Sequence, residues 1–184
     1  MRGRDKLLEP VGDQPLLARV AAEVTAAGVD DTVLVLRPHD RERAAAVAGL
    51  PLRLAPNPRA AEGMGTSIAA GVAALPPGMD GALILLADMP EIGTAEIDRL
   101  LAAFDPAEGR EIVRALAPDG TPGHPVLFGR RFFEALRALE GDEGARRILA
   151  EHHEFLAEVT LPGAAAGTDL DTPEDWARWR AARG

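Results

Sequence analysis

The sequence contains no cysteine, which excludes disulfide bonds, thiolate zinc sites and thiol catalysis. It also has no run approaching the ~20 apolar residues that cross a bilayer. No apolar segment follows the basic start at residues 1–6, so we expect no signal peptide. The net charge is −9 and no basic stripe is present, which argues against a nucleic-acid partner. These absences favour a cytoplasmic protein with no membrane partner.

Length and composition predict one globular domain. The chain has 184 residues, of which 47% are hydrophobic and 27% charged. A chain of this size buries roughly 70% of the surface that it exposes when unfolded. We find no internal repeat of 20–50 residues and no long low-complexity tract.

Lysine is almost absent as well. Lys6 is the only lysine among the 20 basic residues, and all the others are arginine. A lysine usually lies solvated on the surface. Its compact charge nevertheless suits a phosphate, and arginine does not always replace it there.

Apolar runs alternate with amphipathic segments along the chain. Strands are expected at 32–36, 52–54, 82–87, 112–116, 125–128 and 155–161. Helices are expected at 39–47, 66–75, 94–104, 130–139, 145–152 and 173–182, with a first helix capped by Asp13 and ending near Gly28. Alternation of this kind predicts an α/β fold with a mostly parallel sheet covered by helices on both faces. The chemistry then lies beyond the carboxyl ends of the strands.

Acidic residues follow the most apolar strand. Asp88 comes directly after the run at 82–87, which reads as a strand buried on both faces, and Pro90 stiffens the turn. A carboxylate at this place is typical of a Mg²⁺ ligand, or alternatively of an ordinary turn or helix cap.

A second acidic group lies near the end of the sequence. Asp169 and Asp171 precede the helix that Pro173 opens. Asp171 or Thr172 can cap that helix, and one of the two aspartates is a candidate metal ligand.

A glycine-containing segment precedes the helix expected at 66–75. Gly63, Gly65, Thr66 and Ser67 form it, and glycines there let the backbone approach a ligand closely. The alternative is a plain helix start, because the segment is neither a Walker A loop nor G-x-G-x-x-G.

Two further segments carry polar side chains between expected elements. His124 lies in Gly-His-Pro before a strand and is either a substrate contact or a structural histidine. Asp142, Arg146 and Arg147 lie in a glycine-bounded turn that leads into a helix. An arginine there suits a phosphate, and the alternative is an exposed turn.

Six segments together resemble the MobA-like nucleotidyltransferases, and within them the molybdenum cofactor cytidylyltransferases. They are RDKLLEPVGDQPLL (4–17), GMGTSIAAGVAAL (63–75), LLADMP (85–90), GHPVLFGRRFFEAL (123–136), GDEGARRIL (141–149) and DLDTPEDW (169–176). They follow the family's order and cover nearly the whole chain. GHPVLF followed by GDEGAR is closer to the cytidylyl branch than to the guanylyl one.

The resemblance implies a Rossmann-like, three-layer nucleotidyltransferase fold. It implies Mg²⁺-dependent transfer of CMP from CTP to molybdopterin with release of pyrophosphate, and a molybdoenzyme that receives the product. The implied roles are phosphate binding by Lys6, Mg²⁺ binding by Asp88 with Asp171 and Asp169, nucleotide binding by Gly63, Gly65, Thr66 and Ser67, and pterin-side binding by His124, Asp142 and Arg146.

The sequence departs from the family pattern at its start. The family opens with an apolar strand and a glycine-rich loop, and residues 1–3 resemble only the tail of that loop. We therefore expect residues 1–184 to form a single but N-terminally incomplete domain, with a true start about 15–20 residues earlier. Without the strand we expect unpaired strand edges inside the fold, weak folding and little activity.

Other readings remain. A GTP-using enzyme or one with another acceptor would keep the fold, and a decayed homologue would bind and deliver the cofactor without catalysis. An unrelated Rossmann-type oxidoreductase is disfavoured, because no G-x-G-x-x-G follows a strand.

Overall fold

The computed structural model describes residues 5–142, 144–163, 165–167, 170 and 172–181. Its strands are β1 (Pro10–Val11), β2 (Gln14–Pro15), β3 (Val33–Leu36), β4 (Arg53–Pro56), β5 (Gly81–Ile84), β6 (Ile112–Leu116), β7 (Pro122–Gly129) and β8 (Leu156–Thr160). Its α-helices are α1 (Leu16–Ala26), α2 (Arg41–Ala46), α3 (Met64–Ala73), α4 (Thr94–Ala103), α5 (Phe133–Arg137), α6 (Arg146–Glu151) and α7 (Pro173–Ala181). Two short 3₁₀ helices, η1 (Lys6–Leu8) and η6 (Ala165–Gly167), bear on the site.

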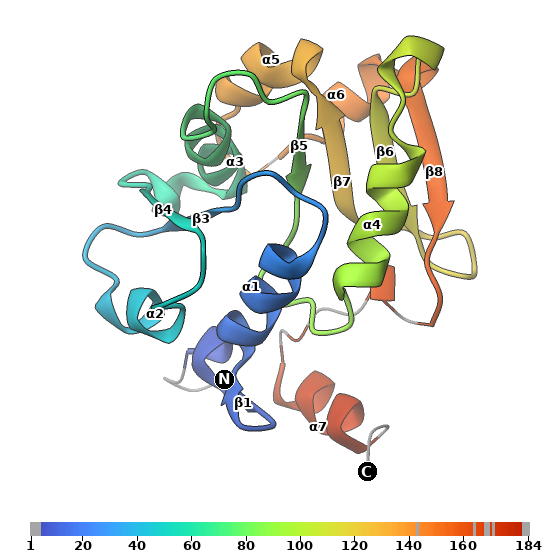
Figure 1. Cartoon of the computed structure of the whole chain (residues 1–184). Helices are drawn as coiled ribbons and strands as arrows, with labels where there is room; N and C mark the ends of the chain where they lie inside the picture. Colours follow the sequence, from blue (N-terminus) through green and yellow to red (C-terminus); the bar gives the residue numbers. More distant parts are fainter. Residues whose placement is uncertain (1–4, 143, 164, 168–169, 171, 182–184) are drawn as a thin grey trace.

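The strands form a four-stranded sheet in the order β5-β7-β6-β8 and a separate parallel pair, β3-β4. Within the larger sheet β7 runs antiparallel to both neighbours and β6 pairs parallel with β8, so three of its four strands share one direction. The sheet is therefore mostly but not purely parallel, as Figure 1 shows.

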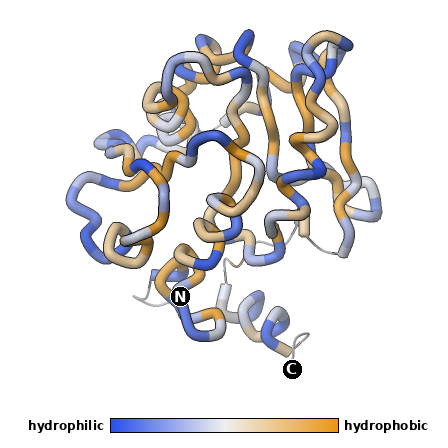
Figure 2. Tube along the Cα trace, in the orientation of Figure 1, coloured by the Kyte–Doolittle hydropathy of each residue, from blue (hydrophilic) through white to orange (hydrophobic). Residues whose placement is uncertain are grey.

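Helices cover both faces of this sheet, which gives three layers (Figure 1). Alternation along β7 explains why. Val126 and Phe128 point to a core shared with α3, α5 and α6, whereas Leu127 points to a core shared with α4. This two-residue period is how a strand buried on both faces serves two helical layers. In Figure 2 the hydrophobic segments run along the strands and the hydrophilic ones along the outer turns.

Two sequence predictions are wrong at the first helix and at β5. Asp13 does not cap α1; it lies in the turn of the β1–β2 hairpin, and Pro15 is the N-cap. The strand expected at 82–87 ends its ladder at Ile84, and Leu83 is only partly buried. β5 pairs with β7 along one edge, and within the described residues no strand pairs with its other edge. One uncovered edge explains the incomplete burial.

The edges of β3 and β5 carry no ladder between them in the described part of the chain. Both edges leave backbone N–H and C=O groups without a strand partner, and such groups are costly when they are removed from water.

The segment around α7 packs back onto the first helix. Leu170 and Trp176 are 1% and 3% exposed and join Val11, Leu16 and Val20 in one buried cluster. Leu170 and Trp176 therefore lie next to the first twenty described residues, far from them in sequence.

Candidate active site

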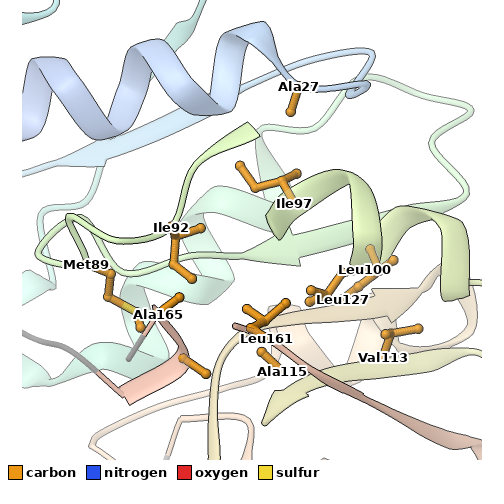
Figure 3. Close-up of a cluster of buried hydrophobic side chains, with 11 residues drawn as sticks. Ala27, Met89, Ile92, Ile97, Leu100, Val113, Ala115, Leu127, Leu161 and Ala165 are labelled. Atoms are coloured by element: carbon orange, nitrogen blue, oxygen red, sulfur yellow. The ribbon is translucent and has the colours of Figure 1, made fainter. Parts of the chain in front are cut away.

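Asp88 lies at the carboxyl side of β5, in a loop that the core holds firmly. Met89 and Ile92, which follow it, are 2% and 1% exposed and belong to the buried cluster drawn in Figure 3. The amide of Ile92 donates to the carbonyl of Met89 at 3.3 Å, which closes the turn. Burial of two large side chains directly after Asp88 leaves the carboxylate little freedom of position.

Lys6 and Asp88 form a direct ion pair. Lys6 Nζ lies 2.6 Å from Asp88 Oδ2, and the two side chains are 31% and 16% exposed. The second carboxylate oxygen of Asp88, Oδ1, is buried and has no hydrogen-bond partner among the described residues. The sequence predicted a phosphate-binding lysine and a metal-binding aspartate separately. The structure brings the two side chains into contact.

Residues near the end of the chain also reach Asp88. The amide of Leu170 donates to the backbone carbonyl of Asp88 at 3.3 Å. Asp169 and Asp171, the other predicted metal ligands, lie outside the described residues, so their role stays a prediction. Within the described residues no three His, Asp or Glu side chains gather as a metal-binding group.

His124 lies in the same region, at the start of the buried part of β7. Burial lowers the pKa of its imidazole, and the carbonyl of Ile84 and the charge of Asp88 act in the opposite direction. Arg146 lowers the pKa further. The His124 side chain therefore lies within electrostatic reach of both Asp88 and Arg146, and it is neutral at pH 7. Its Nδ1 is buried without a hydrogen-bond partner in the described part of the structure.

Gly123, the residue before His124, allows a close backbone contact with η6. A Cβ atom at position 123 would lie 1.9 Å from the carbonyl oxygen of Ala166. Contacts this short do not occur, so a side chain at this position would force η6 away. Gly123 thus keeps η6 close to the strand that carries His124.

The glycine segment before α3 is organised by a residue that the sequence analysis did not single out. Asn57, 3% exposed, donates through Nδ2 to Thr66 Oγ1 and to Ser67 Oγ, both at 3.0 Å. Its Oδ1 accepts the amide of Arg59 at 2.9 Å. Thr66 Oγ1 also lies 2.9 Å from the carbonyl of Gly63. The Thr66 and Ser67 hydroxyls therefore hold the loop together. Asn57 directly follows β4, but the strand expected at 52–54 ended too early for the sequence to show this.

The glycines of this segment contact the turn that contains Asp142. The amide of Gly65 donates to the carbonyl of Gly141 at 2.8 Å. A Cβ atom at Gly63, whose φ is 126°, would lie 2.4 Å from Asp142 Oδ1, and one at Gly65 would lie 2.7 Å from the carbonyl oxygen of Glu140. The predicted nucleotide loop and the predicted pterin-side turn are thus one contiguous surface.

A charged network supports the same contact. Arg59 pairs with Glu62 at 2.8 Å and with Glu140 at 3.0 Å. These bonds raise the pKa of Arg59 and, through Arg59, lower the pKa of Glu62. Arg147, the other arginine of the turn region, lies 3.9 Å from Glu151 on its own helix and is solvent-exposed. The Arg147 side chain therefore points to solvent and does not contribute to the site.

The geometry defines a polar region at the carboxyl side of the sheet, formed by Lys6, by Asp88 with one buried carboxylate oxygen, and by His124, whose pKa burial lowers. Residues 1–155 match the MobA-like NTP transferase domain, so the chain belongs to this family. It is an enzyme of the nucleotidyltransferase class, and its mostly parallel α/β fold is the one that the resemblance implied.

Named relatives are similar over different lengths. The purine catabolism protein PucB of Bacillus subtilis is 35% identical over 120 residues, which are 64% of this chain and 56% of PucB. The chain therefore spans little more than half of that relative. The nicotine blue oxidoreductase of Paenarthrobacter nicotinovorans is 27% identical over 179 residues, 94% of this chain and 86% of that protein.

Solved structures share the whole architecture. Rv0371c of Mycobacterium tuberculosis H37Rv superposes with a TM-score of 0.81 at 26% identity, covering 96% of this chain and 89% of that one. A complex of Rv0371c with manganese gives a TM-score of 0.78 at 26% identity, covering 96% and 91%. Among the described residues, none of the helices combines the length and apolar character that a bilayer crossing requires.

Proposed function

We propose that this enzyme transfers CMP from CTP to molybdopterin, with Mg²⁺ as its metal, and that the product passes to a molybdoenzyme. The observation that carries the proposal is the pair of Lys6 and Asp88, 2.6 Å apart, with the second oxygen of Asp88 buried and lacking a partner in the described residues. One side chain suits a triphosphate and the other a divalent cation.

The donor set fits a hard cation that arrives with the nucleotide. Mg²⁺ prefers oxygen ligands and is usually bound through one or two carboxylates together with substrate phosphates. Asp88 Oδ1 supplies such an oxygen, and we expect Asp171 and Asp169 to supply the rest. A manganese complex of a protein 26% identical to this chain supports a divalent metal. When bound, the metal would neutralise phosphate charge.

The chain's own residues would mainly position the reactants. In the proposed reaction a terminal phosphate oxygen of the pterin forms a bond to the α-phosphorus of CTP, and the bond to the pyrophosphate oxygen breaks. Such a transfer needs in-line alignment and charge stabilisation rather than covalent help. Lys6 would move from Asp88 to the triphosphate, and the segment Gly63–Ser67 would face the nucleotide.

The acceptor would lie on the His124 side. Arg146, whose charge reaches His124, is exposed and able to bind a phosphate. Neutral His124 would offer a ring nitrogen to the acceptor as a donor or an acceptor, without adding charge. Asp142, which packs against Gly63, would contact the pterin between the nucleotide segment and His124.

A nucleotide panel tests the proposal. Purified protein is incubated with Mg²⁺, molybdopterin and CTP, GTP, ATP or UTP, and pyrophosphate release is measured. We expect release with CTP only. Release with GTP only would replace cytidylyl transfer by guanylyl transfer. Binding of CTP in a calorimeter with no release in the presence of acceptor would favour a cofactor-binding module.

A further inference from the structure

Arg43 of α2 forms a two-bond ion pair with Asp5, the residue that precedes Lys6. Arg43 Nε lies 2.7 Å from Asp5 Oδ2, and its Nη2 lies 3.0 Å from Asp5 Oδ1. Two parallel bonds between a guanidinium and a carboxylate fix both distance and orientation, unlike a single-bond pair. The side chains are 27% and 28% exposed, so much of the pair is screened from bulk water.

The guanidinium is itself oriented from its own helix. Asp40 caps α2 by accepting the amide of Arg43 at 3.2 Å, and its Oδ2 lies 3.6 Å from Arg43 Nε. Asp40 at the N-terminus of α2 therefore helps to orient the Arg43 guanidinium toward Asp5.

Asp5 also accepts hydrogen bonds from the two residues that follow Lys6. Its Oδ1 accepts the amide of Leu7 at 3.0 Å, and its carbonyl accepts the amide of Leu8 at 3.0 Å. These bonds close the short helix η1 around Lys6. Leu7 packs against buried residues of α1, which holds the other side of the turn. Lys6 therefore lies between Asp5, which Arg43 binds, and Leu7, which packs against α1.

We propose that Asp5 and Arg43 are positioning residues that fix the place of the Lys6 ammonium group. Before the nucleotide binds, that group contacts Asp88, and after binding it contacts a nucleotide phosphate. This inference rests on the function proposed above. An exposed ion pair alone contributes little to stability. This pair is different because Asp5 also accepts the amides of Leu7 and Leu8, which directly follow a lysine whose Nζ lies 2.6 Å from the Asp88 carboxylate. The hydrogen bond from Arg43 is the first cause that lowers the pKa of the Asp5 carboxyl.

The single lysine of the chain makes the test direct. Folded protein is treated briefly with acetic anhydride, and acetylation of Lys6 is quantified by peptide mass spectrometry. We compare wild type with Arg43→Met and Asp5→Asn, and with Arg41→Met as a control on the same helix. Circular dichroism verifies that each variant is folded at the labelling temperature.

We expect Arg43→Met and Asp5→Asn to raise the acetylation rate of Lys6 roughly two- to fivefold, the range of a partly exposed ion pair. Arg41→Met should label like wild type. Unchanged labelling in both single variants overturns the proposal.

Catalysis gives a second readout. The KM for CTP should rise in Arg43→Met by a similar factor, because Lys6 meets the nucleotide phosphates. The labelling experiment needs no nucleotide, so it stands even if the proposed reaction is wrong. If Mg²⁺ and CTP do not change Lys6 labelling in wild type, the proposed function is contradicted. The positioning role of Asp5 and Arg43 is still tested by labelling of the Arg43→Met and Asp5→Asn variants.

Discussion

Lys6 Nζ lies 2.6 Å from Asp88 Oδ2, although 82 residues separate the two in the chain. The ammonium group occupies one carboxylate oxygen and leaves the other buried without a partner in the described residues. A cation that binds Asp88 must therefore share the carboxylate with Lys6 or displace it. Nucleotide phosphates would give Lys6 an alternative partner of the same charge.

Asp88→Asn tests the carboxylate. The amide keeps the shape but loses the negative charge, so we expect pyrophosphate release to fall roughly 10²- to 10³-fold with the melting temperature nearly unchanged. Asp80→Asn is the matched control, because Asp80 pairs with Arg130 and its side chain is 86% exposed. Wild-type turnover in Asp88→Asn would remove this residue from the mechanism.

Lys6→Ala tests the ammonium group. Loss of a charged hydrogen bond to phosphate should reduce kcat/KM for CTP roughly 10- to 100-fold. Lys6→Arg keeps the charge with a different geometry and should recover only part of that loss. Steady-state kinetics with varied CTP measures both. Equal kcat/KM values for Lys6→Ala and wild type would contradict the assignment.

Gly65→Ala should favour the helical conformation of α3 but disrupt the contact of α3 with the 140–142 turn. Alanine favours a helix over glycine by about 1 kcal/mol, yet its Cβ would lie 2.7 Å from the Glu140 carbonyl oxygen. We expect the 140–142 turn to move, which should raise tryptic cleavage after Arg146 and the KM for the acceptor. The Kd for CTP with Mg²⁺ should rise as well, because Gly65 belongs to the segment proposed to face the nucleotide and its amide bonds to Gly141 of the displaced turn.

Gly28→Ala is the control for that substitution, since a Cβ there meets only ordinary contacts, at 3.5 Å from Asp98 and 3.8 Å from Leu101. A Gly65→Ala protein that is more stable than wild type and equally resistant to trypsin would show that the turn does not need this glycine.

His124 gives a pH dependence. Its folded pKa lies below the ordinary histidine value of about 6.5 because of burial, so the unfolded state binds the proton more readily. The free energy of unfolding should therefore fall as pH drops through 6.5 and level off below the folded pKa. His124→Gln should weaken that fall. Urea unfolding between pH 7.5 and about 5 measures it, and parallel curves would contradict the assignment.

Asn57→Ala removes the amide that joins Thr66, Ser67 and Arg59. We expect a loss of about 1–3 kcal/mol in the free energy of unfolding, because buried hydroxyl and amide groups lose their partner. Ser67→Ala removes only one of these bonds and should cost less. Equal urea midpoints for Asn57→Ala and wild type would mean that water replaces the side chain without cost.

The sequence predicts most elements because their patterns are local. The strands at 33–36, 112–116 and 156–160 lie within one residue of the ranges expected. β5 differs because its extent depends on neighbours: the run at 82–87 is apolar throughout, but pairing ends at Ile84. The β1–β2 hairpin escaped prediction because each strand has only two residues, too few for a periodic signal.

The sequence indicates candidate site residues but not their contacts. Asp88 is a candidate because it follows an apolar strand, and Lys6 because it is the single lysine. The bond between them, the Asp5–Arg43 pair and the contact of Gly65 with Gly141 join residues distant in sequence. Such pairings are set by tertiary packing, which no local pattern reports.

The burial of Trp176 against Leu16 and Val20 has a practical consequence. Cleavage just after residue 167 would remove both Leu170 and Trp176, uncover the hydrophobic side of α1 and release the amide that contacts the Asp88 carbonyl. The same cut would also remove Asp169 and Asp171, the other expected metal ligands, so we expect it to abolish the proposed transfer. Expression designs should leave residues 170–179 intact and place affinity tags beyond them.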